Sequence, residues 1–321
     1  MTLVSRRRFG AFVLTLGALV SACSSSSTPA GQAGAGATPT TGAPTAPASV
    51  ATNFPVTVST PGGTLTVKAL PVAIVSLSPT ATEMLFAIGA GKQVIAVDDQ
   101  SNYPADAPKT DLSGFQPNVE AIAAKKPDLV VISDNGAKLT DSLGALNIPV
   151  LLLPPATTFD DMYGQLEALG TAVGKGNEAK GVADQMRANI KELVAKVPAK
   201  PVKIFHEVDT TLYSASSASF IGQVYALFGV ENIADAADKD KTGYPQLNNE
   251  YVVQANPQVI FLSDGVFEKQ DASTVAGRAG WADIDAVKTK RVVILDPDTS
   301  SRWGPRVVSF VQTIADTLGK V

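Results

Sequence analysis

NVEAIAAKKPDLVVISD (residues 118–134) and NNEYVVQANPQVIFLSD (residues 248–264) are two copies of one pattern, and they decide the fold. They align without a gap at a constant offset of 130 residues. Each copy predicts a short helix with a glutamate in its first turn, a proline that ends it, and an apolar strand followed by a polar pair. The chain therefore holds two lobes of one design. The matched residues are Glu120 and Glu250, Pro127 and Pro257, Ser133 and Ser263, and Asp134 and Asp264.

The first copy stands among further short apolar runs that alternate with helical patterns. We predict strands over 72–77, 94–97, 129–133 and 150–153. Thr80 to Glu83 predicts a capping box for a helix that Gly89 ends, and Pro61-Gly62-Gly63 predicts an earlier hairpin. Strand–helix–strand units of this size favour parallel pairing, so the first lobe, 53–158, is α/β.

Two helical stretches follow within 159–198 with no strand between them, and they separate two sheets. The second lobe, 199–321, repeats the α/β alternation. Its predicted strands are 202–208, 259–262 and 292–295, and its predicted helices are 220–228 and 307–318.

The amino terminus predicts export. Arg6, Arg7 and Arg8 precede an apolar run that is shorter than the roughly 20 residues a membrane-spanning helix needs. Residues 1–22 are thus a signal peptide, and VSAC, ending in the single cysteine Cys23, resembles a bacterial lipobox whose cysteine is acylated. The alternative is a stray cysteine beside an ordinary signal. SRRRFG also resembles a twin-arginine motif, which leaves the export route open.

Composition limits the partners. After Cys23, residues 24–52 are almost wholly Ser, Thr, Ala, Gly and Pro, which predicts a disordered tether to the membrane. The whole chain has 26 basic and 30 acidic residues, and loss of the three arginines in 1–22 leaves 23 against 30. An acidic balance disfavours nucleic acid as a partner. Once Cys23 is acylated, no cysteine is left for disulfides, so burial of the hydrophobic core must hold the lobes together. We expect a monomer.

Four segments carry a resemblance to a known family: SLSPTATEMLFAIGAG (76–91), DDQSNYP (98–104), FQPNVEAIAAKKPDLVV (115–131) and YPQLNNEYVVQANPQVIFLSD (244–264). They resemble the cobalamin and ferric-siderophore binding proteins, over residues 70–318. The resemblance implies two Rossmann-like lobes joined by a long helix, a ligand between them, and docking onto an ABC permease dimer with its ATPase. Glu120 and Glu250 match the glutamates that meet permease arginines. The alternative is that both only stabilise helix N-termini.

The ligand is expected where the carboxyl ends of both sheets face each other. The rare aromatic residues of these loops are Tyr103, Phe115, Tyr244 and Trp303. By resemblance to the cobalamin branch, the first three match positions that press on a large ring, although that branch has tryptophan at Phe115 and Tyr244. The alternative for each is a loop anchor on its own lobe. The predicted ligand-binding residues are Ser78, Tyr103, Phe115, Gln116, Tyr244, Arg302 and Trp303.

Charged residues offer other readings of the site. Arg302 and Arg306 suit an anionic ligand, but Arg306 is equally suited to pair with an acid at the start of the last helix. His206 and Met84 are candidates for heme ligation, or else core residues. Asp98 and Asp99 are adjacent in a strand pattern and point to opposite faces, so they are a poor catalytic or metal-binding pair.

These patterns favour an extracytoplasmic, lipid-anchored solute receptor of an ABC importer. Its ligand is expected to be a bulky cyclic chelate, a corrinoid such as cobalamin or a ferric siderophore, with heme as the alternative in the same fold. Any cobalt or iron would arrive in the ligand, since we predict no cofactor or metal site of the protein's own. The alternative from another functional class is an exported enzyme that acts on a small molecule, but the sequence contains no catalytic motif that would support it. A scavenger that serves no transporter would need neither Glu120 nor Glu250.

Overall fold

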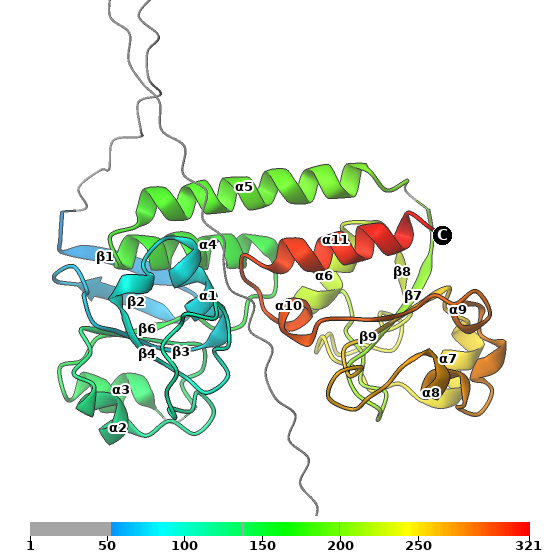
Figure 1. Cartoon of the computed structure of the whole chain (residues 1–321), viewed down its shortest axis with the longest axis horizontal. Coiled ribbons are helices and arrows are strands. Elements are labelled where there is room, and N and C mark those ends of the chain that lie inside the picture. The colour runs from blue at the N-terminus through cyan, green and yellow to red at the C-terminus, as the bar shows by residue number, and fades with distance from the viewer. Residues whose placement is uncertain (1–52, 137, 199) are drawn as a thin grey trace, which may run out of the picture. The chain divides into compact units, whose positions relative to one another are not determined.

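The computed structural model describes residues 53–136, 138–198 and 200–321 (Figure 1). The predicted signal peptide, Cys23 and the tether lie outside these residues. Within them the chain forms one antiparallel hairpin and two separate parallel sheets of four strands each. The predicted α/β fold with parallel sheets is confirmed.

The hairpin comes first and packs onto the first lobe. Strands β1 (Val56–Thr60) and β2 (Gly63–Val67) pair directly across the turn Pro61–Gly62. The hydroxyl of Thr60 donates to the carbonyl oxygen of Leu152 at 2.8 Å. At Gly62 an added Cβ would come within 2.5 Å of Leu152, so only glycine allows this close approach.

The first lobe has strand order β4-β3-β5-β6, with all pairs parallel. Parallel pairing requires crossovers, and these carry the helices. Every residue of β3 and β5 is buried, as expected for strands covered on both faces. The elements are β3 (Ile74–Leu77), α1 (Pro79–Ala87), η1 (Gly91–Gln93), β4 (Val94–Val97), α2 (Val119–Ala124), β5 (Leu129–Ile132), α3 (Leu139–Gly144) and β6 (Val150–Leu152).

Helix α1 begins earlier than the sequence predicted. Its N-cap is Ser78, whose side chain accepts from the backbone N–H of Ala81, and Pro79 occupies the first turn. The predicted capping box from Thr80 to Glu83 is therefore wrong: Thr80 already lies within the helix. Gly89 ends the helix with φ at 76°, as predicted.

The second lobe has strand order β10-β9-β7-β8, again parallel throughout. Strand β9 and helix α11 match their predicted bounds, whereas β8 and α8 to α10 are too short to produce a readable period. The elements are β7 (Lys203–Glu207), α6 (Phe220–Ala226), β8 (Glu231–Asn232), α7 (Asn249–Ala255), β9 (Val259–Leu262), α8 (Ala272–Ala276), η2 (Trp281–Asp283), α9 (Asp285–Lys288), β10 (Val292–Ile294), α10 (Pro297–Ser301) and α11 (Val307–Leu318).

The repeat extends beyond the segments that first revealed it. Strand β3 pairs with β5 from Ile74↔Leu129, and β7 pairs with β9 from Ile204↔Val259, so both partners are displaced by the same 130 residues. Asn118 and Asn248 are the N-caps of α2 and α7, and each accepts from the third residue after it. Both lobes thus share the register of their central strands and the caps of the helices beside them.

Two long helices join the lobes. Helix α4 (Phe159–Ala172) begins at a capping box between Thr158 and Asp161, and α5 (Gly176–Ala195) follows. Helix α5 packs on α4 and on α11 of the second lobe (Figure 1). One hydrophobic cluster runs from Ile74 through Leu166 and Ile190 to Phe310. In the part of the chain that the structure describes, no helix combines the length and hydrophobicity needed to cross a membrane.

Candidate ligand-binding site

A cavity of about 530 Å³ lies at the carboxyl ends of both parallel sheets. The first lobe contributes Ser78 after β3, Asp98 after β4 and Asp134 after β5. The second lobe contributes Phe267 after β9 and Arg302 after β10. Open α/β sheets bind ligands at this edge, and the volume is typical of small-molecule sites.

Two exposed phenyl rings, one from each lobe, line this cavity. Phe115 is 86% exposed and Phe267 is 75% exposed. Covering such exposed apolar side chains with a ligand lowers the free energy of the complex. Aromatic faces also stack favourably on a flat ring of the ligand. Phe267 was not among the predicted ligand-binding residues, although Val266 and Phe267 are apolar residues in an otherwise polar loop.

Four of the seven predicted ligand-binding residues line the cavity: Ser78, Phe115, Arg302 and Trp303. Trp303 is held by a hydrogen bond from its Nε1 to Oε1 of Gln165 in α4, at 3.1 Å. The cavity lining does not include Tyr103, Gln116 or Tyr244. Gln116 and Tyr244 are exposed, and Tyr103 borders a smaller cavity of about 340 Å³ together with Glu83 and Arg306.

Glu83 joins the two lobes. Its side chain is 1% exposed, and its carboxylate accepts two hydrogen bonds from Arg306, at 2.9 and 2.6 Å, and one from Arg302 at 2.8 Å. Arg306 was expected to pair with an acid at the start of the last helix, but its partner is Glu83, in helix α1 of the other lobe. Hydrogen bonding to Glu83 raises the pKa of Arg306. The guanidinium carbon of Arg306 also lies 4.3 Å from the ring centroid of Tyr103.

Asp98 and Asp99 diverge as their positions in the strand pattern predict. Asp98 is buried and accepts a hydrogen bond from the hydroxyl of Ser101, whereas Asp99 is exposed. Burial raises the pKa of Asp98. The two carboxylates do not converge on one atom, so they offer no acid–base pair.

His206 and Met84 are both buried away from the cavity. His206 Nδ1 lies 2.8 Å from the hydroxyl of Tyr225, and Nε2 lies 3.0 Å from the hydroxyl of Ser263. Burial lowers the pKa of His206 to about 3, which keeps the imidazole neutral. Since both ring nitrogens have protein partners, His206 has a structural role here, and heme ligation by this pair finds no support. The described ranges contain no group of three or more side chains arranged to hold a metal ion.

A buried carboxyl pair, Glu207 and Asp264, lies at the carboxyl ends of β7 and β9, and it was not predicted from the sequence. Glu207, at the end of β7, receives two hydrogen bonds of 2.6 Å from Arg278. Asp264, 3% exposed, has no hydrogen-bond partner for either carboxylate oxygen among the described residues. Burial, together with the charge of Glu207, raises the pKa of Asp264 to about 7.

Glu120 and Glu250 lie in the first turns of α2 and α7, where the sequence predicted them. Both side chains are exposed. Neither forms an ion pair with another residue of the described chain. They are therefore matched charges open to a partner.

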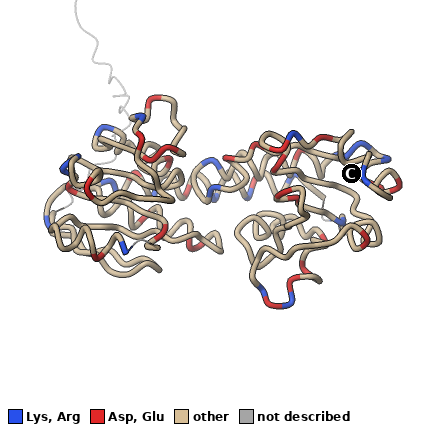
Figure 2. Tube along the Cα trace, turned by 90° about the horizontal axis from the view of Figure 1, so that it is seen from below, with Lys and Arg blue, Asp and Glu red and all other residues tan. Residues whose placement is uncertain are grey.

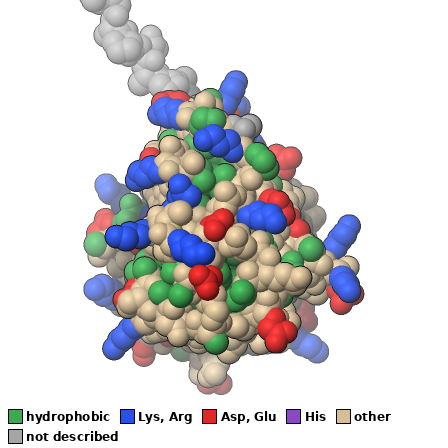
Figure 3. All heavy atoms as spheres, turned by 90° about the vertical axis from the view of Figure 1, so that its right-hand side faces the viewer, with side chains coloured by type: hydrophobic (Ala, Val, Ile, Leu, Met, Phe, Trp, Pro, Cys, Tyr) green, Lys and Arg blue, Asp and Glu red, His purple; other side chains and the backbone are tan. Residues whose placement is uncertain are grey.

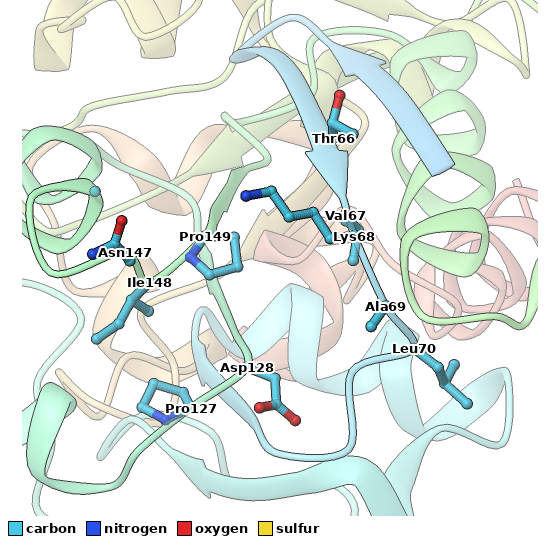
Figure 4. A pocket seen from close by; sticks show the side chains of 11 residues that line it. Thr66, Val67, Lys68, Ala69, Leu70, Pro127, Asp128, Asn147, Ile148 and Pro149 are labelled. Atoms are coloured by element: carbon cyan, nitrogen blue, oxygen red, sulfur yellow. The ribbon is translucent and has the colours of Figure 1, made fainter. Parts of the chain in front are cut away.

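A second cavity, of about 520 Å³, lies at the amino ends of β5 and β6, opposite the predicted loops (Figure 4). Lys68 extends across it toward Asn147. Asp128 is engaged, because its Oδ2 accepts from the backbone N–H groups of Val72 and Ala73 at 2.9 and 3.0 Å. The lining of this second cavity comes from one lobe only and includes no aromatic ring, whereas both lobes and the rings of Phe115, Phe267 and Trp303 line the cavity between the lobes.

Charge elsewhere is mixed. Acidic and basic positions intersperse along the trace (Figure 2), and both signs occur on the end face of the second lobe (Figure 3). Neither view shows a broad basic stripe of the kind that binds nucleic acid. The electrostatics that matter for a small ligand are those of the cavity itself.

Comparisons with known proteins concern the sequence and the fold. The family model described as "Periplasmic binding protein" matches residues 74–299. The ABC transporter substrate-binding lipoprotein YvrC of Bacillus subtilis is 31% identical over 83% of this chain and 86% of its own length. The vitamin B12-binding protein of Pectobacterium atrosepticum is 32% identical over 79% of this chain and 90% of its own.

Solved structures show the same fold. The vitamin B12-binding protein BtuF of Vibrio cholerae has a TM-score of 0.65 and 26% identity, over 77% of this chain and 96% of its own. A possible iron-binding protein of Staphylococcus epidermidis has a TM-score of 0.69 and 25% identity, over 78% and 99%. The heme-binding protein RhuT of Roseiflexus, at 21% identity and a TM-score of 0.68 over 77% and 98%, shows the fold alone.

Proposed function

The chain belongs to the periplasmic binding protein family, and its relatives are substrate-binding proteins of transporters rather than enzymes. On this premise we propose that it captures a bulky cyclic chelate. The observation that carries the proposal is the cavity between the lobes, flanked by the open rings of Phe115 and Phe267. A planar macrocycle between them would bury both rings, whereas a small sugar or amino acid would leave much of them exposed. We place a corrinoid first and a ferric siderophore second, since two relatives are vitamin B12-binding proteins.

Delivery to an ABC permease dimer is the second part of the proposal. Glu120 and Glu250 stand at equivalent places on two lobes and are exposed without intramolecular partners among the described residues. Two such carboxylates suit two basic sockets on a symmetric permease, because complementary charges fix the orientation of docking. A scavenger that serves no transporter gives no reason for this matched placement.

Anchoring completes the proposed cycle. We place the mature protein outside the cell membrane, exported through residues 1–22 by the general or the twin-arginine route and acylated at Cys23. The lipoprotein YvrC among the relatives supports the anchor. A tether over 24–52 would let the lobes reach the permease while the receptor stays on the membrane.

A fluorescence titration tests the ligand. The chain has two tryptophans: Trp303 lines the cavity, whereas Trp281 is fully buried in the second lobe. We would titrate the full chain with cobalamin, cobinamide, heme and several ferric siderophores while following tryptophan emission. Saturable quenching by a corrinoid or a ferric siderophore is expected.

The matched control is Trp303→Phe against Trp281→Phe. Quenching that comes from the cavity disappears in the first variant and persists in the second. Saturable binding by none of these chelates would overturn the proposal, and binding by heme alone would replace its ligand.

A further inference from the structure

The charges around the cavity between the lobes are unequal. Its lining holds three carboxylates, Asp98, Asp134 and Asp298, and a single guanidinium, that of Arg302. Asp298 forms an ion pair with Arg302 at 2.7 Å, so the carboxylates of Asp98 and Asp134 are left without an ion-pair partner among the described residues. A ligand entering this cavity therefore meets an acidic wall.

Arg302 offers little to a ligand carboxylate, because both of its terminal nitrogens already donate to protein oxygens. Its Nη1 donates to Oε1 of Glu83 at 2.8 Å and to Oδ1 of Asn102 at 2.9 Å. Its Nη2 donates to Oδ1 of Asp298 at 2.7 Å and to the carbonyl oxygen of Gln100 at 3.2 Å. A carboxylate on the ligand would have to displace a protein carboxylate that already makes the same charge-assisted contact.

Arg306 is engaged in the same way. Both oxygens of Glu83 accept from it, and the ring of Tyr103 covers one face of its guanidinium. Asn102 adds a further bridge between the lobes, since its Nδ2 donates to Oδ2 of Asp298 at 2.7 Å. The two arginines that the sequence offered for anion binding instead hold the lobes together.

We infer that this cavity accepts neutral or cationic chelates and rejects chelates that carry free carboxylates or other anionic groups. The inference rests on the proposed function, since it concerns the same site. The exposed carboxylate of Asp134 sets the preference, and Glu83 and Asp298 maintain it by occupying the arginines. A cleft lined by one sign of charge focuses its field, so like-charged ligands are excluded at little cost to the accepted ones.

Matched ligand pairs test this charge rule. One pair is cyanocobalamin and its derivative with one peripheral amide hydrolysed to a carboxylate; the other is heme dimethyl ester and heme. In each pair that binds, the neutral member is expected to bind at least about tenfold more tightly at low ionic strength, the lower end of the effect of a focused cleft field. Asp134→Asn should shrink this ratio, because it removes an exposed negative charge from the cavity lining. The variant should keep the local fold, since the asparagine oxygen can still accept the hydrogen bond from the N–H of Gly136. Equal or tighter binding of the carboxylate member would overturn the inference while leaving the receptor function intact.

A probe that needs no ligand separates the two proposals. In the full chain with Cys23→Ser, Phe115→Cys places the only thiol at the cavity, and Leu146→Cys places it at an exposed position outside the cavity lining. The rates of modification by cationic and anionic methanethiosulfonate reagents are then compared. The cationic reagent should gain at least about tenfold over the anionic one at position 115 relative to position 146, and salt should erase the gain.

A rate ratio at position 115 equal to that at position 146, or one that favours the anion, would sink the inference even if chelates bind. A cationic preference together with no chelate binding would instead keep the charge rule and reject the proposed function.

Discussion

The two copies of the repeat share a backbone structure and differ in how far they bury their last residue, an aspartate. In the first lobe, Asp134 is exposed beside the ligand cavity. In the second lobe, Asp264 is buried, and its neighbour is the carboxylate of Glu207. The strand registers and helix caps of the two copies are nevertheless the same.

The difference comes from the neighbouring strand and not from the repeat itself. Glu207 ends β7, and the residue in the matching place on β3 is Leu77. In the first lobe, where Leu77 stands in that place, Asp134 is exposed. In the second lobe Glu207 is paired with Arg278, and burial together with the charge of Glu207 raises the pKa of Asp264. The repeated segments thus determine the backbone of both lobes, whereas residues outside the repeat determine which side chains surround its last aspartate.

The largest expected effect tests where the copies act alike. The double change Glu120→Gln with Glu250→Gln should abolish cellular uptake and stimulation of the reconstituted ATPase, because losing a desolvated interfacial charge costs roughly 2–5 kcal/mol at each site. Melting temperature and ligand affinity should stay near wild type, since an exposed helix-end charge contributes under about 1 kcal/mol. Uptake that survives the double change at normal protein levels would contradict the docking role. Unequal single variants would show that the two lobes are not read alike by the permease.

A second test concerns the buried carboxyl pair that only one lobe has. Arg278→Leu leaves Glu207 and Asp264 together without their cation, and removing one partner of a buried ion pair destabilises a protein by about 3–5 kcal/mol. Chemical denaturation should show this loss. Ile148 of the first lobe is a partly buried apolar residue that makes no ion pair, so Ile148→Leu is the control and should change the free energy of unfolding by under about 1.5 kcal/mol. If Arg278→Leu changes the free energy of unfolding only slightly, water reaches the carboxylates of Glu207 and Asp264 and screens their charges.

A third test asks whether the lobes share the ligand. Phe115→Ala and Phe267→Ala should each weaken chelate binding by roughly 2 kcal/mol, as for a buried aromatic anchor, while the fold persists. Tyr103 and Tyr244 were also predicted from the sequence to bind the ligand, although the cavity lining does not include them, so Tyr103→Ala and Tyr244→Ala are the comparison variants. Isothermal titration of all four variants discriminates the two sets. Loss at only one of the two phenylalanines would assign the ligand to a single lobe.

Sequence patterns predicted the fold better than the site, for a physical reason. Apolar period and proline position act locally, so β9 and α11 were predicted to the residue and the first-turn glutamates were placed correctly. The contacts of Glu83 with Arg302 and Arg306 join residues more than 200 positions apart, and no local pattern encodes them. The burial of Asp264 escaped prediction likewise, because the residues that enclose it come from β7 and the segment after α8. Short elements such as β8 also lack the length that a period requires.

The smallest expected effect concerns the last residue of each copy and depends on pH. The folded state raises the pKa of Asp264 to about 7 from the usual 3.8. Between these values the native state binds more protons than the unfolded state, so this group makes stability fall as pH rises from about 4 to about 7, and the penalty is then constant at higher pH. Asp264→Asn keeps the shape, remains neutral and should raise the free energy of unfolding at pH 8 by on the order of 1–2 kcal/mol, with little change at pH 4.

Asp134→Asn is the matched control, because the side chain of Asp134 is exposed and should show no such pH dependence. The measurement is the free energy of unfolding by urea between pH 4 and pH 8 for the wild type and both variants. If Asp264→Asn and Asp134→Asn give parallel pH profiles, the two copies bury their last carboxyl to the same extent in solution, and the asymmetry between the lobes is lost. If only the Asp264 variant flattens the profile, the second lobe alone keeps a protonated carboxyl behind the edge where its sheet meets the ligand.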